Sequence, residues 1–437
     1  DTSRQLADNL DKFQAKWGAA EAAPYRGSLP SQPEPPTPAP VPKRNATVSL
    51  TMIVKNEEDN LAACVAGWQT LFDELVIVDT GSTDRTREIA AAQGARVIVS
   101  SWHDSFSTAR NESLQHATSD CVFWLDADDR LLPENRQKLQ ALFATLSPQQ
   151  PSAYSLKCRC WLDAHGQTAT VVDHLRLFPR HEKIRWEHRI HEQILPAIRR
   201  VALPVQHAPI EVTHLGYADP AKKPQKMQRD LRLLLLEEQE RPQHPFTLFN
   251  LGSVYVELKD WEKALSYLQR SLDSSHVQDS IVRKLFALLA ECEWRLQRRE
   301  AALARLALGR QHYPHDAELL FLSGRYHRET GDYPTAITHL EALLTSQDKE
   351  HFGSSNDGLR GRVGQHELAH TLCQAGQLER AVTLWTQLVA LAPQDWQAWQ
   401  RLAEIAPQVG QTDLHQQAVQ ALQGRPNLPQ PTNLTKK

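Results

Sequence analysis

The stretch FWLDADD, residues 123–129, places three carboxylates directly after an apolar run that begins at Cys121. A short apolar run without helical periodicity indicates a buried strand. Asp126 and Asp128 are two residues apart, so their side chains can point to the same side of an extended chain. Carboxylates at the end of a buried strand are costly unless a cation answers them, and a hard divalent cation prefers such oxygen ligands. The alternative is a solvated acidic turn after a core strand.

Strands and helices alternate along the chain before this stretch. We expect strands at 48–54, at 74–78 ending on Asp79, at 95–99 and at 121–125. Helical patterns lie between them, at 61–71, after Asp84 and at 105–117. Continuous apolar strands that alternate with helices predict an α/β fold with a parallel sheet covered on both faces.

Polar side chains follow three of the predicted strands. Asn56 and Glu57 follow the first strand, Asp79 ends the second, and Asp126 and Asp128 follow the fourth. Ligands of parallel sheets collect at the carboxyl ends of the strands. The sequence therefore predicts a metal or nucleotide site at this edge of the sheet.

The second half of this region is less regular. A helix is expected after Pro133, and a β-hairpin over 153–162 and 168–178 with its turn at 163–166. Residues 185–192 gather several ionisable groups beside Trp186, which we expect in the core. His214 follows a short apolar strand that begins at Val212.

Helical repeats follow from about residue 245. The first helices of five two-helix copies are expected near 245, 283, 317, 362 and 396, on landmarks such as Gly252 with Leu268 and Gly324 with Leu340. The longest gap between copies holds residues 346–361, a polar insertion that we expect to be an exposed loop. These copies resemble tetratricopeptide repeats, which stack into a curved solenoid.

The composition limits the class of protein. A formal net charge of −3 favours neither nucleic acid nor an anionic membrane as a partner. No apolar run approaches the roughly 18 residues of a membrane span, and no signal segment opens the chain. Six cysteines without CxxC spacing are typical of a reducing compartment, so we expect a cytoplasmic protein. Because the chain opens on Asp1, we expect a processed or trimmed product.

Four motifs in order resemble the inverting family 2 glycosyltransferases of the GT-A fold, a Rossmann-like nucleotide-sugar domain. They are MIVKNEE at 52–58, VDTGSTD at 78–84, ARN at 109–111 and LDADD at 125–129. Their combination with C-terminal repeats is similar to a bacterial subgroup that includes peptide S-glycosyltransferases. Residue patterns and the resemblance together predict four segments: a helix and proline-rich linker at 1–47, the GT-A domain at 48–220, the repeats at 221–425 and a disordered tail at 426–437.

The resemblance also implies roles for the matching residues. Val54, Asn56 and Glu57 would line the nucleotide pocket, and Asp79 would hydrogen-bond the uracil of a UDP-sugar. Arg110 would lie near the nucleobase or the phosphates. Asp126 would face the ribose and the metal ion, and Asp128 would bind that ion, Mn²⁺ or Mg²⁺.

Two further roles fall in the second half. The base that takes the acceptor's proton is predicted to be Glu192, and the alternative for this residue is an ion pair with Arg189 or Arg185. His214 is predicted to complete the metal shell, with His191 as the second choice, and the alternative for His214 is a satisfied core histidine. A zinc site at residues 181–191 is disfavoured because no second histidine of an HExxH helix is present.

The predicted function is metal-dependent transfer of a hexose or N-acetylhexosamine from a UDP-sugar, with inversion, to a peptide, protein or glycan acceptor. The repeats would bind a protein partner or a second copy of the chain. Two alternatives remain: a catalytically silent nucleotide-sugar-binding scaffold, and an enzyme that assembles lipopolysaccharide or another surface glycan. A silent domain would be expected to lose an aspartate of the LDADD motif, which is intact.

Overall fold

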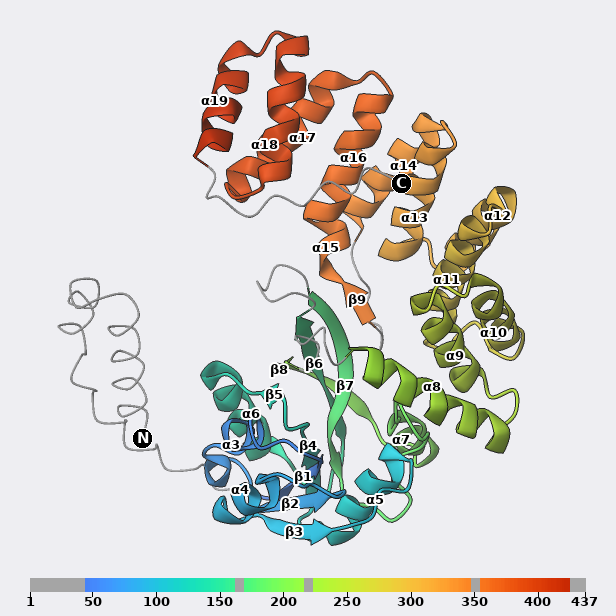
Figure 1. The fold of residues 1–437 in the computed structure, drawn as a ribbon. Helices are drawn as coiled ribbons and strands as arrows, with labels where there is room; N and C mark the ends of the chain where they lie inside the picture. The colour runs from blue at the N-terminus through green and yellow to red at the C-terminus, as the bar shows by residue number, and fades with distance from the viewer. Residues whose placement is uncertain (1–43, 162–168, 216–222, 347–353, 425–437) are drawn as a thin grey trace, which may run out of the picture. The chain divides into compact units, whose positions relative to one another are not determined.

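The computed structural model describes residues 44–161, 169–215, 223–346 and 354–424. The predicted N-terminal helix, the proline-rich linker that follows it, the hairpin turn and the tail at 426–437 lie outside these residues. A mixed sheet with flanking helices comes first along the chain, and helical repeats follow (Figure 1).

Four parallel strands form the first half of the sheet, in the spatial order β3, β2, β1, β4. Their bounds are β1 Val48–Val54, β2 Glu74–Asp79, β3 Arg96–Val99 and β4 Cys121–Trp124. In the register, Val54 lies opposite Asp79 and Thr51 opposite Trp124. The predicted strands and their parallel pairing are confirmed, so the polar residues that follow β1, β2 and β4 come to one edge.

The second half of the sheet contains antiparallel strands. The sheet as a whole is therefore mixed, and the expectation of a parallel sheet holds only for its first half. β7 pairs antiparallel with β4, and the order continues β7, β6, β8, β5. The bounds are β5 Asp129–Arg130, β6 Ala153–Trp161, β7 Ala169–Pro179 and β8 Val205–His214. The antiparallel pairing of β6 with β7 confirms the predicted hairpin.

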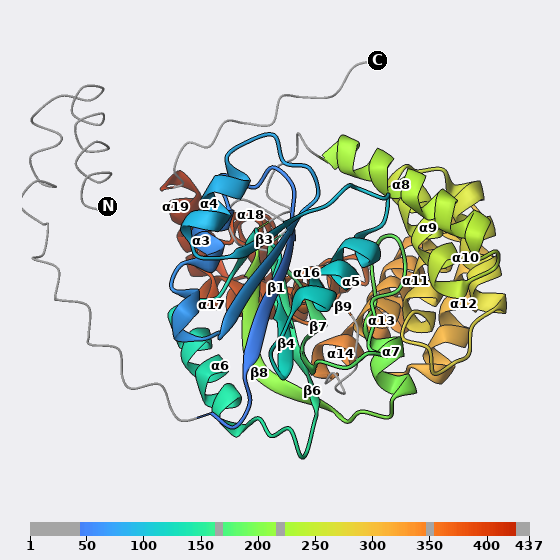
Figure 2. The ribbon, with the colours of Figure 1, turned by 90° about the horizontal axis from the view of Figure 1, so that it is seen from below.

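Helices cover both faces of this sheet. Figure 2 shows α3, α4 and α6 on one side of the strands and α5 and α7 on the other. Their bounds are α3 Leu61–Val65, α4 Thr86–Ala92, α5 Phe106–His116, α6 Pro133–Thr145 and α7 Leu195–Arg200. The continuous helix expected over 61–71 is wrong beyond Val65. Gly67 takes a left-handed φ of 67° there, and a 3-10 turn, η1 Trp68–Thr70, replaces the rest.

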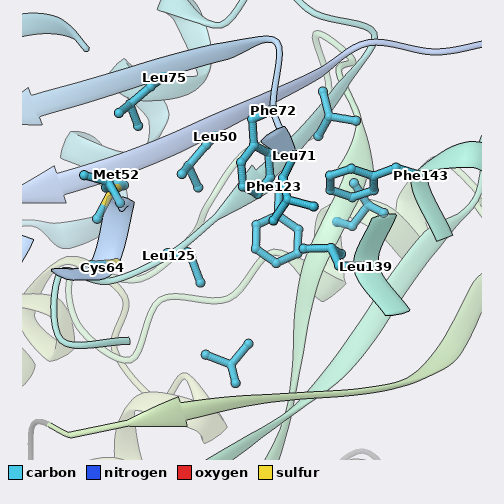
Figure 3. Close-up of a cluster of buried hydrophobic side chains, with 14 of the residues drawn as sticks. Leu50, Met52, Cys64, Leu71, Phe72, Leu75, Phe123, Leu125, Leu139 and Phe143 are labelled. Atoms are coloured by element: carbon cyan, nitrogen blue, oxygen red, sulfur yellow. The ribbon is translucent and has the colours of Figure 1, made fainter. Parts of the chain in front are cut away.

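Successive side chains of β4 point to opposite faces of the sheet, and each face has its own hydrophobic cluster. Phe123 points into one cluster, where its ring centroid lies 5.5 Å from that of Phe72 and 6.2 Å from that of Phe143 of α6 (Figure 3). Trp124 points to the opposite face, into a cluster with residues of α5 and α7. Trp186 joins that second cluster with 6% of its surface exposed, which confirms its predicted place in the core.

The repeats begin where the sequence places them. The helices are α9 Pro245–Glu257, α10 Trp261–Asp273, α11 Val282–Arg295, α12 Arg299–His312, α13 Ala317–Glu329, α14 Tyr333–Thr345, α16 Arg362–Gln374, α17 Leu378–Leu391, α18 Trp396–Ile405 and α19 Thr412–Gln423. A short 3-10 turn, η3 Ala406–Val409, lies between the last two. A Cβ added at Gly252 would lie 2.5 Å from Leu268, and one at Gly324 equally close to Leu340. These landmarks are thus the close contacts between paired helices.

Two regions depart from the sequence-based expectation. Helix α8, Lys223–Glu240, precedes the repeats and was not predicted. The insertion expected to be an exposed loop holds β9, Ser354–Asn356, which pairs antiparallel with β7, and α15, Asp357–Arg360. Backbone pairing with a strand some 180 residues away leaves no periodic signal in so short a segment. Among the helices described, none is long and apolar enough to cross a membrane.

Candidate functional site

Three carboxylates and one imidazole meet just beyond the end of β4. Asp126, Asp128, Asp129 and His214 offer ligand atoms that all lie within 4.8 Å of one another. The sheet brings them together because β5 pairs with β8 and sets Asp129 directly opposite His214. The structure therefore places His214, and not His191, beside the acidic motif.

Asp129 is the buried anchor of this group. Its side chain is fully buried and pairs with Arg176 of β7, whose Nη1 lies 2.6 Å from Oδ2. The same carboxylate accepts the backbone N–H of Asp126 at 2.9 Å, which fixes the turn. Arg176 is 1% exposed and is a site residue that the sequence did not reveal. A buried carboxylate requires such a cation, but no local pattern says which strand supplies it.

The charges of this group act on one another. Burial disfavours the charged form of His214, yet the hydrogen bond to Asp129 and the nearby carboxylates outweigh burial and raise the pKa of His214 from 6.5 to about 9. Burial raises the pKa of Asp128, and the charges of Asp126 and Asp129 add to that rise against the opposing effect of His214. Asp128 therefore lies where more positive charge would be favourable.

Arg110 joins the acidic group to the second half of the domain. Its Nη2 donates to Asp126 Oδ1 at 2.8 Å and its Nε to Glu192 Oε1 at 2.5 Å. The arginine is 5% exposed, so the solvated charge that is usual for a helical arginine does not describe it. Both carboxylates raise the pKa of Arg110 against the opposing effect of burial, which keeps it charged. The alternative for Glu192, an ion pair with Arg189 or Arg185, is not found among the described residues, since Glu192 pairs with Arg110 and Arg189 pairs with Glu240.

Trp124 supports two of these cations at once. The guanidinium carbon of Arg110 lies 4.3 Å from the ring centroid of Trp124, and that of Arg176 lies 3.8 Å from it. Trp186 packs edge-on against Trp124 at 5.2 Å. Cation–π contacts of this kind hold guanidinium groups in dry surroundings. One aromatic residue, two positions before Asp126, thus orients the arginines that bind Asp126 and Asp129.

Asp79 ends β2 and is fully buried. Its Oδ1 accepts the backbone N–H groups of Gly81 and Ser82 at 3.1 and 2.9 Å. Its Oδ2 has no hydrogen-bond partner among the described residues. Since buried polar atoms are nearly always paired, this oxygen marks a place where a donor from a ligand would fit.

The predicted pocket residues at the end of β1 bind the neighbouring loop. The Val54 carbonyl accepts from Thr80, both from its N–H at 3.0 Å and from its hydroxyl at 3.1 Å. Asn56 takes a left-handed φ of 56°, and its Oδ1 accepts the N–H of Thr83 at 2.8 Å. The N–H of Glu57 donates to Thr86 Oγ1 at 2.7 Å. These contacts fix the loop that follows Asp79.

Comparisons with known proteins agree with this geometry. Residues 49–154 match the family described as Glycosyl transferase family 2. Residues 247–279, 288–351 and 362–405 match families described as Tetratricopeptide repeat. The first match covers β1 to the start of β6, and the others fall on helices between α9 and α18.

Two relatives with curated names are similar to more than half of this chain. A TPR repeat-containing protein of Synechococcus elongatus is 29% identical over 60% of this chain and 65% of its own length. The SPbeta prophage-derived glycosyltransferase SunS of Bacillus subtilis is 27% identical over 58% of this chain and 59% of its own length. The chain thus spans about three fifths of these relatives.

One similar solved structure is the C-terminal part of a TPR repeat-containing protein from Cytophaga hutchinsonii. The match covers 46% of this chain and 74% of the solved chain. Its TM-score is 0.38 and its identity to this chain is 13%. The family matches and the sheet geometry lead to one conclusion: the chain carries a glycosyl transferase family 2 domain followed by tetratricopeptide repeats.

Proposed function

We propose that the protein transfers a hexose or N-acetylhexosamine from a UDP-sugar to a peptide, protein or glycan acceptor, with inversion and with a divalent metal ion. The observation that carries the proposal is the group of Asp126, Asp128, Asp129 and His214 at the carboxyl edge of a family 2 domain. A structural protein has little reason to gather three carboxylates there.

The donor set fits Mn²⁺ or Mg²⁺. Asp128 and His214 would hold the ion, since Asp129 is occupied by Arg176 and Asp126 by Arg110. Oxygen ligands with one imidazole suit Mn²⁺ well, and carboxylates also suit Mg²⁺. When bound, such an ion stabilises the negative charge that develops on the departing diphosphate.

The remaining roles fall to residues of the chain itself. Oδ2 of Asp79 would accept the N3–H of uracil, because it is a buried acceptor that lacks a donor. Glu192 would take the acceptor's proton. Its Oε1 is held by Arg110, while its Oε2 has no hydrogen-bond donor within the described part of the chain, which leaves that oxygen for the acceptor.

The domains divide the work in this proposal. The segment 48–220 would bind the donor and perform the transfer, and the repeats within 221–425 would bind a protein acceptor, a partner or a second copy. Stacked repeats offer an extended binding surface, which is the physical reason for assigning recognition to them.

Calorimetric titration of UDP tests the donor site first. We expect binding with Mn²⁺ or Mg²⁺ that EDTA removes and that Asp128→Ala abolishes. Glu88→Ala, which changes an exposed carboxylate of α4, is the matched control and should bind as the wild type does. Absence of binding under every condition would refute the proposal.

Transfer is then tested with labelled UDP-sugars against peptide libraries and lipid extracts. Sugar appearing on a peptide supports a protein acceptor, and sugar appearing on lipid supports surface-glycan assembly. Tight UDP-sugar binding without hydrolysis or transfer to any acceptor would favour the silent scaffold instead.

A further inference from the structure

The segment that leads into Glu192 is held by helix α8. His188 Nδ1 and Glu237 Oε1 share a hydrogen bond of 2.5 Å, and both side chains are almost fully buried. The second oxygen of Glu237 accepts the backbone N–H of Arg189 at 2.9 Å. One carboxylate of α8 thus fixes a side chain and the backbone of the next residue.

This segment has a backbone that needs support. His188 and His191 adopt left-handed φ values of 73° and 54°. Residues with a β-carbon avoid this region, and it persists only where the surroundings hold it. Arg189 supplies part of that support, since its guanidinium pairs with Glu240 of α8 and donates to the carbonyl of Asp104 at 2.9 Å.

Apolar packing adds a second attachment to α8. Ile190 is 4% exposed and lies in a cluster with Leu233 and Leu234 of α8 and Leu251 of α9. Burying a side chain of this size contributes roughly as much as several hydrogen bonds, so the segment cannot shift without losing it.

The same segment also touches the helix that carries Arg110. The N–H of Phe106, the first residue of α5, donates to the carbonyl of Arg189 at 2.7 Å. Arg110 lies one turn later on α5, and Glu192 follows three residues after Arg189. Contacts of α8 therefore fix the segment that places Glu192 beside Arg110, in a pair 2.5 Å long.

We infer that Glu237 is a positioning residue for sugar transfer: through His188 and Arg189, it holds Glu192 in place for the acceptor's proton. The inference rests on the proposed function, in which Glu192 is the base. It assigns a part of the reaction's geometry to the first helix after the family 2 domain and adds no catalytic residue.

Steady-state transfer kinetics with UDP titration in parallel test this inference. Glu237→Ala should lower kcat by about 10- to 100-fold, since small misplacements of reacting groups cost that much. Its UDP affinity should remain that of the wild type, because Glu237 contacts neither Asp79 nor the acidic group. Glu237→Gln should recover much of kcat, because the amide oxygen still accepts the Arg189 N–H and the amide keeps the size and shape of the carboxylate beside His188.

The matched control is Glu238→Ala. This residue lies on the same helix, but its carboxylate pairs with Arg270 of α10, away from the Glu192 segment. We expect wild-type kcat from this variant. A Glu237→Ala protein with wild-type kcat would overturn the inference. So would a parallel loss of kcat and of UDP-binding stoichiometry in both Glu237 variants, because that result indicates lost fold.

Hydrogen exchange separates this inference from the proposed function. In Glu237→Ala, backbone amides of residues 186–193 should exchange faster than in the wild type, while those of β1 and β2 stay unchanged. If the wild type transfers no sugar, the proposed function fails on that result alone. Unchanged exchange at 186–193 would then overturn the positioning of Glu192 as well.

Discussion

Glu192 accepts a 2.5 Å hydrogen bond from Nε of Arg110, a residue 82 positions earlier in the chain. The same guanidinium binds Asp126 at its other end. The predicted base and the acidic motif are therefore joined through one buried cation. Residues in such direct contact are energetically coupled, so the effect of a substitution at one of them depends on the other two.

Glu192→Gln should separate chemistry from binding. The amide keeps the shape and can still accept from Arg110, but it cannot take a proton. We expect kcat to fall by about 100- to 10,000-fold while the dissociation constant of UDP stays the same. Glu187→Gln, a nearby carboxylate that pairs with Arg200, is the control. A Glu192→Gln enzyme with normal kcat would show that this carboxylate only pairs with Arg110.

Neighbouring aspartates should respond in opposite ways. Asp129→Asn leaves Arg176 buried without its charge partner and should lower the free energy of unfolding by about 3 to 5 kcal/mol. Asp128→Asn should leave the metal-free protein equally or more stable, because burial and like charges already disfavour this carboxylate. Urea denaturation in EDTA measures both. Equal losses in the two variants would contradict the division into an anchor and a metal ligand.

Asp79→Asn should change which nucleobase, uracil or cytosine, the protein prefers. The side chain keeps the acceptor for Gly81 and Ser82 but presents an NH₂ group in place of Oδ2. UDP affinity should fall by about 10- to 100-fold, as expected for losing a hydrogen bond to a charged group. CDP should lose less or gain, because N3 of cytosine is an acceptor. Competition titrations with both nucleotides give the ratio, and an unaltered ratio would remove Asp79 from base recognition.

His339 in the repeats should make stability depend on pH. Burial lowers its pKa from 6.5 to about 4, and the nearby charges of Arg310 and His327 act in the same direction against Asp332. The unfolded chain binds the proton more readily, so this contribution is fully present above pH 6.5 and is lost as pH falls through about 4. His339→Gln should show a smaller loss of unfolding free energy between pH 7 and pH 4. Identical losses would contradict the buried neutral state.

The local sequence pattern was enough to predict the elements whose apolar residues form a run or recur at a regular spacing. The four parallel strands and the first helices of the repeats followed from apolar runs and from landmarks such as Gly252 and Gly324. The meeting of Asp128 with His214 was also predicted, although their roles remain predictions. That proximity was implied by the family resemblance and not by spacing, since the two residues are 86 positions apart.

Long-range register decided what sequence reasoning missed. Arg176 is one of two charged residues along β7, and only the pairing of β7 with β4 brings it to Asp129. The partner of Glu192 was sought among adjacent arginines, whereas folding supplied Arg110 from α5. Helix α8 lacks the landmarks of the repeats, so its role became visible only through its contacts with residues 188–190.

Helix α8 also limits where the repeats can be exchanged for those of another protein. Tandem repeats are usually regarded as interchangeable modules that are fused to an enzyme for recruitment. Here Glu237 of α8 hydrogen-bonds to His188, and Leu233 of α8 packs in one cluster with Ile190. A chimera joined before α8 would retain every motif of the transferase and still lose the support of Glu192. Productive exchange of repeats therefore requires a junction after Glu240, with α8 inherited as part of the enzyme.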